Sequence, residues 1–278
     1  MCLILIAYHV HPDYPLIVAA NRDEFYHRPT KPAHIWPDSS QVLAGLDMQQ
    51  GGTWLGVTRM GRFAAVTNVR NGFAEKNPQH LSRGLLTRNF LTQECSPSDY
   101  IKQLTADRYA GFNLLLADAN SLHYFTNQAT ADPGKIRQVV SEPNSTIIDQ
   151  TRSQLQPGIY GLSNAALDTS WPKLERAKAR LANICTQTTP SQEQLFCLLQ
   201  DRYVAADDQL PDTGISIEWE RKLAPGFIQS SDYGTRASTL VMIHRSGIIE
   251  FIEQNFDNQG PTDLITLRMK SNSDDHQL

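Results

Sequence analysis

The chain begins with the stretch MCLILIAYHV, residues 1–10, which determines its first strand. Residues 2–8 form a short apolar run with two β-branched isoleucines, which predicts a strand. Cys2 directly follows the initiator methionine and is small enough for that methionine to be removed. We therefore expect the mature chain to start with a residue that carries a thiol and a free α-amine on one carbon.

The composition indicates an ordinary globular protein. The chain has 278 residues, of which 40% are hydrophobic, enough for one large domain or two small ones. Charged residues make up 19% and the formal net charge is -4, so no basic excess indicates a nucleic-acid partner. The cysteines are Cys2, Cys95, Cys185 and Cys197, and none forms a CxxC pair. This sparse set predicts reduced thiols in a cytoplasmic protein.

The apolar start is not typical of a signal peptide. It lacks a basic leading region, and Asp13 and Arg22 follow without a small-residue cleavage site. No stretch reaches the roughly 18 apolar residues of a membrane span. These features predict a soluble protein with no transmembrane segment.

Several further runs predict antiparallel strands. LIVAA at 16–20 follows the turn cluster HPDYP, so it should pair with residues 2–8. Hairpins are predicted at 53–69, around Met60-Gly61, and at 112–126 and 238–254. The first pairing would bring Cys2 beside residues 21–24.

Helices are predicted between the strands. Ser96 with Asp99 indicates a start for 97–104, and Ser191 with Gln194 is a capping box for 191–203. Apolar residues keep helical spacing over 171–185, and 81–92 is a further helix. This order predicts an α+β fold. We expect one domain over residues 1–256, followed by a polar and partly disordered tail at 257–278.

Cys2 is the first candidate for chemistry. A cysteine thiol has a pKa of about 8.5 and an α-amine has a pKa of about 7.8, so the amine can accept the thiol proton near neutral pH. Such a residue is a nucleophile with its own general base. The alternative is a small buried residue at the start of a strand.

Polar residues at the ends of other apolar runs form a second group of candidates. Asp23 could orient the α-ammonium of Cys2, although a surface turn would also place charges there. Asn68 and Asn164 could donate to an oxyanion, or could simply form turns. Arg236 could bind a carboxylate or stabilise a thiolate, or could be a surface arginine.

Seven motifs together resemble a known family. They are NRDE (21–24), GGTWLG (51–56), TNVR (67–70), SRG (82–84), GFNLL (111–115), GLSNAALD (161–168) and YGTRAST (233–239). The chain resembles the NRDE family, also called the transport and Golgi organization protein 2 family. That family is similar to N-terminal-nucleophile hydrolases of the bile salt hydrolase and penicillin V acylase branch, whose fold is a four-layer αββα sandwich of antiparallel sheets.

The resemblance implies roles for individual residues. The catalytic set would be Cys2, Asp23, Asn68, Asn164 and Arg236, with no metal and no cofactor required. Other motif residues are expected to line the binding site, namely Asn21, Arg22, Glu24, Trp54 and Arg70. One position departs from the acylases, which place an arginine three residues before the aspartate, where this chain has Ala20.

Two functions follow from the resemblance. The first is a cysteine hydrolase of amide or thioester bonds in a hydrophobic acyl substrate. The second is a non-catalytic haem-trafficking protein, such as a haem-binding chaperone, or a carrier in lipid and acyl-CoA homeostasis. Haem would be a ligand in that case, and Cys2, His9, His11 and several methionines are candidate axial ligands. The sequence does not predict an oligomeric state.

Overall fold

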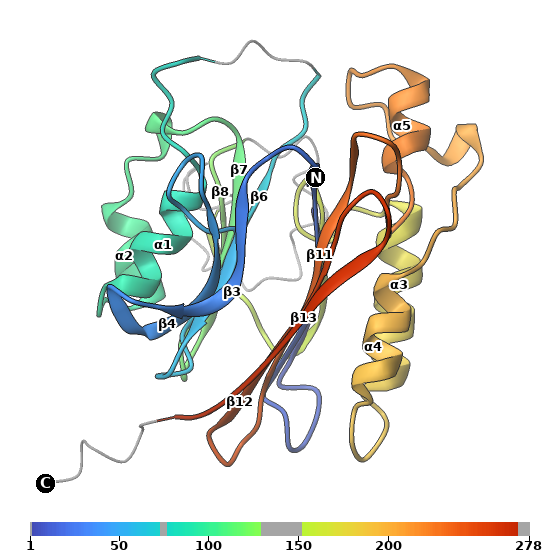
Figure 1. The fold of residues 1–278 in the computed structure, drawn as a ribbon. Helices are drawn as coiled ribbons and strands as arrows, with labels where there is room; N and C mark the ends of the chain where they lie inside the picture. Colours follow the sequence, from blue (N-terminus) through green and yellow to red (C-terminus); the bar gives the residue numbers. More distant parts are fainter. Residues whose placement is uncertain (1, 73–76, 129–151, 272–278) are drawn as a thin grey trace, which may run out of the picture.

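The computed structural model describes residues 2–72, 77–128 and 152–271. They form two antiparallel sheets that pack face to face, with helices covering both outer faces (Figure 1). The predicted α+β class and the four-layer αββα arrangement are confirmed. No helix in the described part of the chain is long and apolar enough to cross a membrane.

The first sheet has six strands in the order β10-β1-β2-β11-β12-β13. Their bounds are β1 Cys2–Tyr8, β2 Leu16–Phe25, β10 Gly158–Leu162, β11 Tyr233–Ile243, β12 Ile248–Phe256 and β13 Pro261–Lys270. The second sheet has seven strands in the order β3-β4-β5-β6-β7-β8-β9. Their bounds are β3 Thr30–Trp36, β4 Ser39–Asp47, β5 Leu55–Thr58, β6 Phe63–Asn68, β7 Phe112–Ala117, β8 Leu122–Thr126 and β9 Arg152–Gln154.

Five α-helices form the outer layers. They are α1 Gly84–Thr92, α2 Pro97–Gln103, α3 Pro172–Ile184, α4 Gln192–Leu199 and α5 Ile217–Leu223. Helices α1 and α2 lie beside the seven-stranded sheet, and α3, α4 and α5 lie on the side of the six-stranded sheet (Figure 1). The predicted caps are present, because the side chains of Ser96 and Ser191 accept from the backbone N–H groups of Asp99 and Gln194.

Alternation along the central strands divides the core. In β1, Ile4 and Ile6 face the opposite sheet, whereas Leu3 and Leu5 face α3 and α4. Residues two apart on a strand share a face, so both faces of this strand are apolar because both are covered. A third cluster packs α1 and α2 on the seven-stranded sheet. Cys2, the first residue of β1, lies on the same face as Ile4 and Ile6, so this face points into the space between the sheets.

Three expectations about the elements need correction. The second strand does not end before the NRDE motif but continues through it to Phe25. The pair β3 and β4 was not expected, because β3 carries Pro32 and pairs irregularly with β4. Residues 261–270, which belong to the expected tail, form β13.

Strand β13 belongs to the fold because one of its faces is apolar. Ile265 and Leu267 pack against the core between the sheets, and Met269 is buried in it. From Ile265 to the end of β13, every second residue therefore contributes to the core, whereas the residues between them are exposed. Residues 272–278 of the expected tail lie outside the described residues.

Two of the quoted motifs meet at a close contact between glycines. A Cβ atom on Gly52 would lie 2.4 Å from the carbonyl carbon of Gly84, at the start of α1. The backbone N–H of Thr53 donates to the carbonyl of Gly84 at 3.1 Å. GGTWLG and SRG thus fix where α1 begins relative to the sheet, and they fix the position of Arg83.

This contact predicts a large effect of one methyl group. Gly52→Ala should lower the free energy of unfolding by about 2 kcal/mol or more, because backbone rather than a flexible side chain must move. Urea unfolding followed by circular dichroism measures the change. Gly158→Ala is the matched control, since its Cβ would meet only the Tyr160 side chain at 3.3 Å. Equal stability of the two variants would contradict the prediction.

Candidate active site at the start of the first strand

A cavity of about 700 Å³ opens between the two sheets beside Cys2. The six-stranded sheet contributes residues of β1, β2, β11 and β12. The opposite wall comes from β3, β4, the segment before β5, the end of β6 and the start of α1. Its lining combines a small apolar set with many charged groups. The cationic side chains are Arg22, Arg28, Lys31, Arg70, Arg83 and Arg236, and the carboxylates are Asp23, Glu24, Asp47 and Glu253.

Cys2 and Arg22 are direct cross-strand partners. The register of β1 and β2 pairs Cys2 with Arg22 and Ile4 with Ala20. Opposite residues of an antiparallel pair point to the same face, so Cys2 and Arg22 both face the cavity. Arg22 lies two residues beyond Ala20 on that face. An arginine is therefore next to the thiol, although not at the position that the acylase pattern predicts.

The segment after β10 holds the main chain of Cys2. The hydroxyl of Ser163 donates to the Cys2 carbonyl at 2.9 Å. The backbone nitrogen of Cys2 donates to Oδ1 of Asn164 at 3.3 Å, and Nδ2 of Asn164 donates to the carbonyl of Asn68 at 2.8 Å. Asn164 thus contacts the nitrogen that would become the α-amine, and it joins β1 to the end of β6.

Asp23 lies buried beside the start of β1, 3% exposed. It accepts a hydrogen bond from the hydroxyl of Thr235, its cross-strand partner, at 2.7 Å. Burial raises the pKa of this carboxyl, and the positive amino terminus of the chain and Lys173 oppose the rise. The structure therefore brings Cys2, Asp23 and Asn164 together, as the sequence predicted.

The thiol of Cys2 is disfavoured as an anion. Burial raises its pKa above the usual value, and the Asp23 carboxylate adds to the rise. The Arg22 guanidinium and a hydrogen bond from the Asp23 backbone act in the opposite direction on this pKa. Because the resting sulfur keeps its proton, chemistry at this site requires a base that removes the proton during attack.

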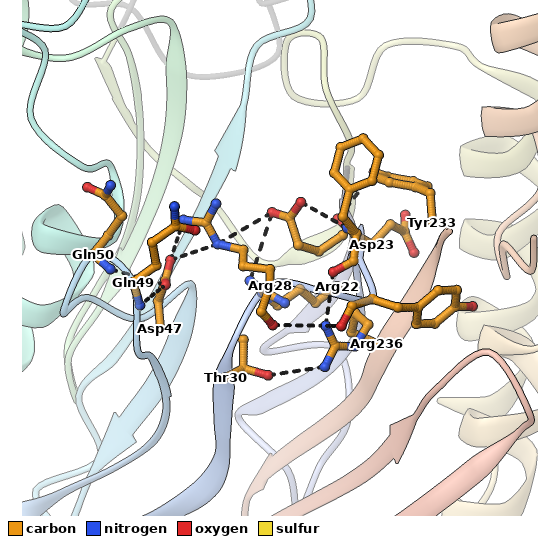
Figure 2. Close-up of polar contacts among 12 residues, drawn as sticks. Arg22, Asp23, Arg28, Thr30, Asp47, Gln49, Gln50, Tyr233 and Arg236 are labelled. Carbon is orange, nitrogen blue, oxygen red and sulfur yellow. Dashed lines mark hydrogen bonds and ion pairs between the residues drawn. The ribbon is translucent and has the colours of Figure 1, made fainter. Parts of the chain in front are cut away.

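Arg236 was expected to stabilise a thiolate or bind a substrate carboxylate, but its guanidinium contacts backbone carbonyls instead. It occupies a bulge in β11 between Thr235 and Ala237. Its guanidinium donates to the backbone carbonyls of Phe25, Tyr26 and Arg28 at 3.0, 3.0 and 3.1 Å (Figure 2). It therefore holds the turn between β2 and β3 and forms part of the cavity wall.

A charged bridge joins the sheets at this end of the cavity. Arg28 extends from the same turn and its Nη2 lies 2.6 Å from the Asp47 carboxylate, at the end of β4 (Figure 2). Glu24 lies 3.8 Å from Arg28 and 4.0 Å from Arg22. Glu24 lines the cavity as expected and connects the bridge to the arginine opposite Cys2.

Asn21 does not reach the cavity, which corrects its expected place in the binding site. It is completely buried on the helix-facing side of β2. Its side-chain amide donates to the carbonyls of Leu199 and Gly226, both at 2.8 Å, and accepts from Ser238 at 2.6 Å. Asn21 thus fixes two connecting segments to the sheet.

Trp54, Asn68 and Arg70 line the cavity, as expected. Arg70 also contacts groups behind it, because Nη1 lies 3.2 Å from the buried Glu220 carboxylate of α5. The guanidinium stacks 4.9 Å from the ring of Trp171. Arg70 therefore links the cavity to the packing of α5.

Three residues of the site were missed by the sequence analysis. Arg83 donates to the Gly111 carbonyl at 3.0 Å, and burial lowers the pKa of its guanidinium. Glu253 accepts from the backbone N–H of Ala33 at 2.8 Å, which ties β12 to β3. Lys173 is buried behind Asp23. Of the three, only Arg83 belonged to a quoted motif.

The candidate haem ligands lie apart from one another. His9 and His11 follow the far end of β1, and the His11 ring contacts Gln187 O at 2.9 Å and Asp13 N at 3.1 Å. Cys2 and His80 both line the cavity. Within the ranges that the structure describes, no group of three His, Cys, Asp or Glu residues is arranged to hold a metal ion.

Proteins of known sequence resemble this chain over nearly its whole length. The transport and Golgi organization protein 2 homolog of Bos taurus is 33% identical over 94% of this chain and 95% of its own. The Homo sapiens homolog is 33% identical over 92% and 93%. Transport and Golgi organization protein 2 of Drosophila melanogaster is 25% identical over 94% of both.

Two solved structures align with most of this chain at low similarity. A C2A mutant of conjugated bile acid hydrolase from Clostridium perfringens gives a TM-score of 0.46 at 10% identity, over 97% of this chain and 92% of that one. An N-acylethanolamine-hydrolyzing acid amidase ortholog from Caenorhabditis elegans gives 0.46 at 10%, over 86% and 92%.

The family model for Transport and Golgi organisation 2 matches residues 1–258, from the candidate nucleophile through the end of β12. With relatives at 33% identity that align over more than nine-tenths of the chain, the protein belongs to the Transport and Golgi organisation 2 family.

Proposed function

We propose that this protein is an N-terminal cysteine hydrolase that cleaves an amide or thioester bond of an acyl substrate. The observation that carries the proposal is the environment of Cys2. Its side chain faces a cavity opposite Arg22, and its backbone nitrogen contacts Asn164 beside the buried Asp23. A thiol, a prospective amine base and a carboxylate that can orient the amine thus share one end of β1.

The first step would transfer the acyl group to sulfur. The Cys2 sulfur attacks the substrate carbonyl carbon, and the thiol proton passes to the neutral α-amine. The tetrahedral oxyanion would accept hydrogen bonds from the Asn68 amide or from the second N–H of Asn164. Collapse breaks the bond to the leaving group, which takes the proton from the α-ammonium. The products are a Cys2 thioester and a free amine or thiol.

The second step would hydrolyse the thioester. The α-amine accepts a proton from water as the water oxygen attacks the thioester carbonyl. The carbon–sulfur bond then breaks, and the proton returns to the Cys2 sulfur. The acyl group leaves as a carboxylic acid, and the amine is neutral again. No oxidant or reductant enters this cycle.

The cavity restricts the substrate. Trp54, Val66 and Leu81 can contact an apolar acyl chain. The resemblance predicted a hydrophobic ligand, but cationic and acidic groups surround these apolar residues. The lining is therefore more polar than a purely hydrophobic ligand would need. The cavity therefore suits an acyl group that carries a polar portion as well.

The main prediction concerns the free amine of Cys2. A chain released by a specific protease so that it begins at Cys2 should hydrolyse one member of a panel of N-acyl amides and acyl thioesters. A chain released with one extra glycine before Cys2 has the same thiol but a displaced amine, and it should be inactive. The variant C2A should lose turnover on the order of 10³-fold or more.

Intact mass spectrometry shows which chain start is present in each sample. The variant C197A is the control, because Cys197 is an exposed thiol outside the cavity. Turnover that persists in C2A, or full activity of the chain with the extra glycine, would reject the mechanism. The absence of Cys2-dependent release over the whole panel would reject the proposed function.

A second prediction concerns Arg22 and pH. The positive charge opposite Cys2 favours the thiolate, so R22M should raise the pKa of the Cys2 thiol further, by about one unit. Below that pKa, the thiolate fraction and the rate of alkylation at Cys2 should then fall roughly tenfold at a given pH. The rates are measured by mass spectrometry against pH. R28M is the control, because Arg28 pairs with Asp47 instead; equal pKa values in R22M and the parent would contradict the role.

A haem carrier is the second candidate. The support for it is that Cys2 and His80 both line the cavity, whose cationic groups could pair with propionate carboxylates. Titration of the protein with haemin at micromolar concentration should then shift the Soret band, and H80A should weaken binding whereas H9A should not. An unchanged spectrum would remove this candidate and leave the hydrolase unaffected.

A further inference from the structure

Lys173 is a buried lysine of the helix layer that packs on β1. It is the second residue of α3 and only 7% exposed. Its Nζ donates to the carbonyl of Leu223, the last residue of α5, at 2.9 Å. A lysine with this little exposure needs partners, because burial of a cation is unfavourable unless other groups compensate it.

The position is unfavourable for a cation in two further respects. The first turn of a helix is the positive end of the helix dipole, where an acidic residue is preferred. Arg70 adds a like charge nearby, whereas Asp23 is the strongest favourable charge. Burial lowers the pKa of Lys173 to about 8, with Asp23 opposing the change. Contacts in the structure place Lys173 and Asp23 in one buried cluster, because Leu223 packs with Tyr233, whose hydroxyl donates to the Asp23 backbone carbonyl at 3.2 Å.

Asp23 therefore faces two amines. One is Lys173, and the other is the α-amine that removal of Met1 would create from the Cys2 nitrogen, which contacts Asn164 at the start of β1. One carboxylate cannot stabilise two neighbouring ammonium groups as strongly as it stabilises one, because the two like charges repel each other. A cation at Lys173 consequently lowers the proton affinity of the α-amine.

We propose that Lys173 is a positioning residue that shares the Asp23 carboxylate with the α-amine of Cys2 and so keeps that amine neutral enough to act as the general base. This inference rests on the proposed function, because it assigns a residue to the same reaction. An amine held by Asp23 alone would stay protonated near neutral pH and could not accept the thiol proton.

Other titratable groups face this cluster and contribute to its charge. They are Cys2 from β1, Arg22 from β2, Arg70 from the segment after β6, Glu220 from α5 and Tyr233 from β11. Arg70 and Glu220 form an ion pair with each other, 3.2 Å apart. Lys173 is the cation of the helix layer whose charge acts on the Asp23 carboxylate.

A purely structural role for Lys173 is the competing explanation. The hydrogen bond to Leu223 could serve only to fix α5 against α3. In that case, replacement of Lys173 would change the stability of the protein but not the proton affinity of the amine. The test must therefore measure the pKa of the α-amine itself.

The experiment measures the pKa of the α-amine without any substrate. In the C2A background, processed at residue 2, the amine is acetylated with acetic anhydride over a range of pH, and the N-terminal peptide is quantified by mass spectrometry. K173M should raise the pKa of this amine by about one unit, which is tenfold in proton affinity. K173R should keep the parent value, because it keeps the charge.

K178M is the matched control, since Lys178 lies on the same helix but pairs with Asp168 at 2.7 Å. Circular dichroism confirms the fold of each variant, and K173Q replaces K173M if that variant does not fold. An amine that titrates alike in the parent and both neutral variants would overturn the inference.

Failure of this inference and failure of the proposed function can be told apart. The amine is titrated in a chain without the thiol, so the result stands whether or not a substrate is found. Cys2-dependent turnover together with an unchanged amine would reject only the role of Lys173. A raised amine pKa in K173M without turnover in the full protein would reject only the hydrolase.

Discussion

The antiparallel register between β1 and β2 is the constraint on which the site depends. It pairs Cys2 with Arg22, and every neighbouring pair down to Tyr8 and Leu16 continues the same register. A shift of β1 by one residue against β2 would turn Cys2 toward the helices and away from the face on which Arg22 lies. Because both faces of β1 are packed in separate cores, such a shift is strongly opposed. Packing far from the cavity thus fixes the geometry of the thiol.

The same alternation explains the NRDE motif as a two-sided element. Arg22 and Glu24 face the cavity, whereas Asn21 and Asp23 face the helix layer. Asp23 also reaches the cavity edge because it lies next to the start of β1. Arg22 and Asp23 therefore set the charge around the sulfur from opposite faces of β2, and Asn21 connects the strand to the helix layer. A surface turn, which the sequence allowed as an alternative, would not require this division.

The sequence was informative where a single strand or turn determined the outcome. Period-2 runs and capping residues located the central strands and four helices, and the pairing of residues 2–8 with 16–20 brought Cys2, Asp23 and Asn164 together. The elements that were missed depend on tertiary contacts. Strand β3 is bulged and tied by Glu253, and β13 has only one buried face. Helix patterns assign polar residues to the surface, so Lys173 was overlooked.

The buried charges behind Cys2 are difficult to explain as elements of stability. A lysine in the first turn of a helix, an arginine and two carboxylates are enclosed where apolar groups of similar volume would often stabilise the fold as well or better. The sequence segments that supply them are distant, from β2, the end of β6, α3 and α5. They surround one strand end that carries a thiol and a nitrogen. Charges arranged in this way shift proton affinities at that end more than they strengthen the core, and perturbed ionisable groups of this kind are typical of functional sites.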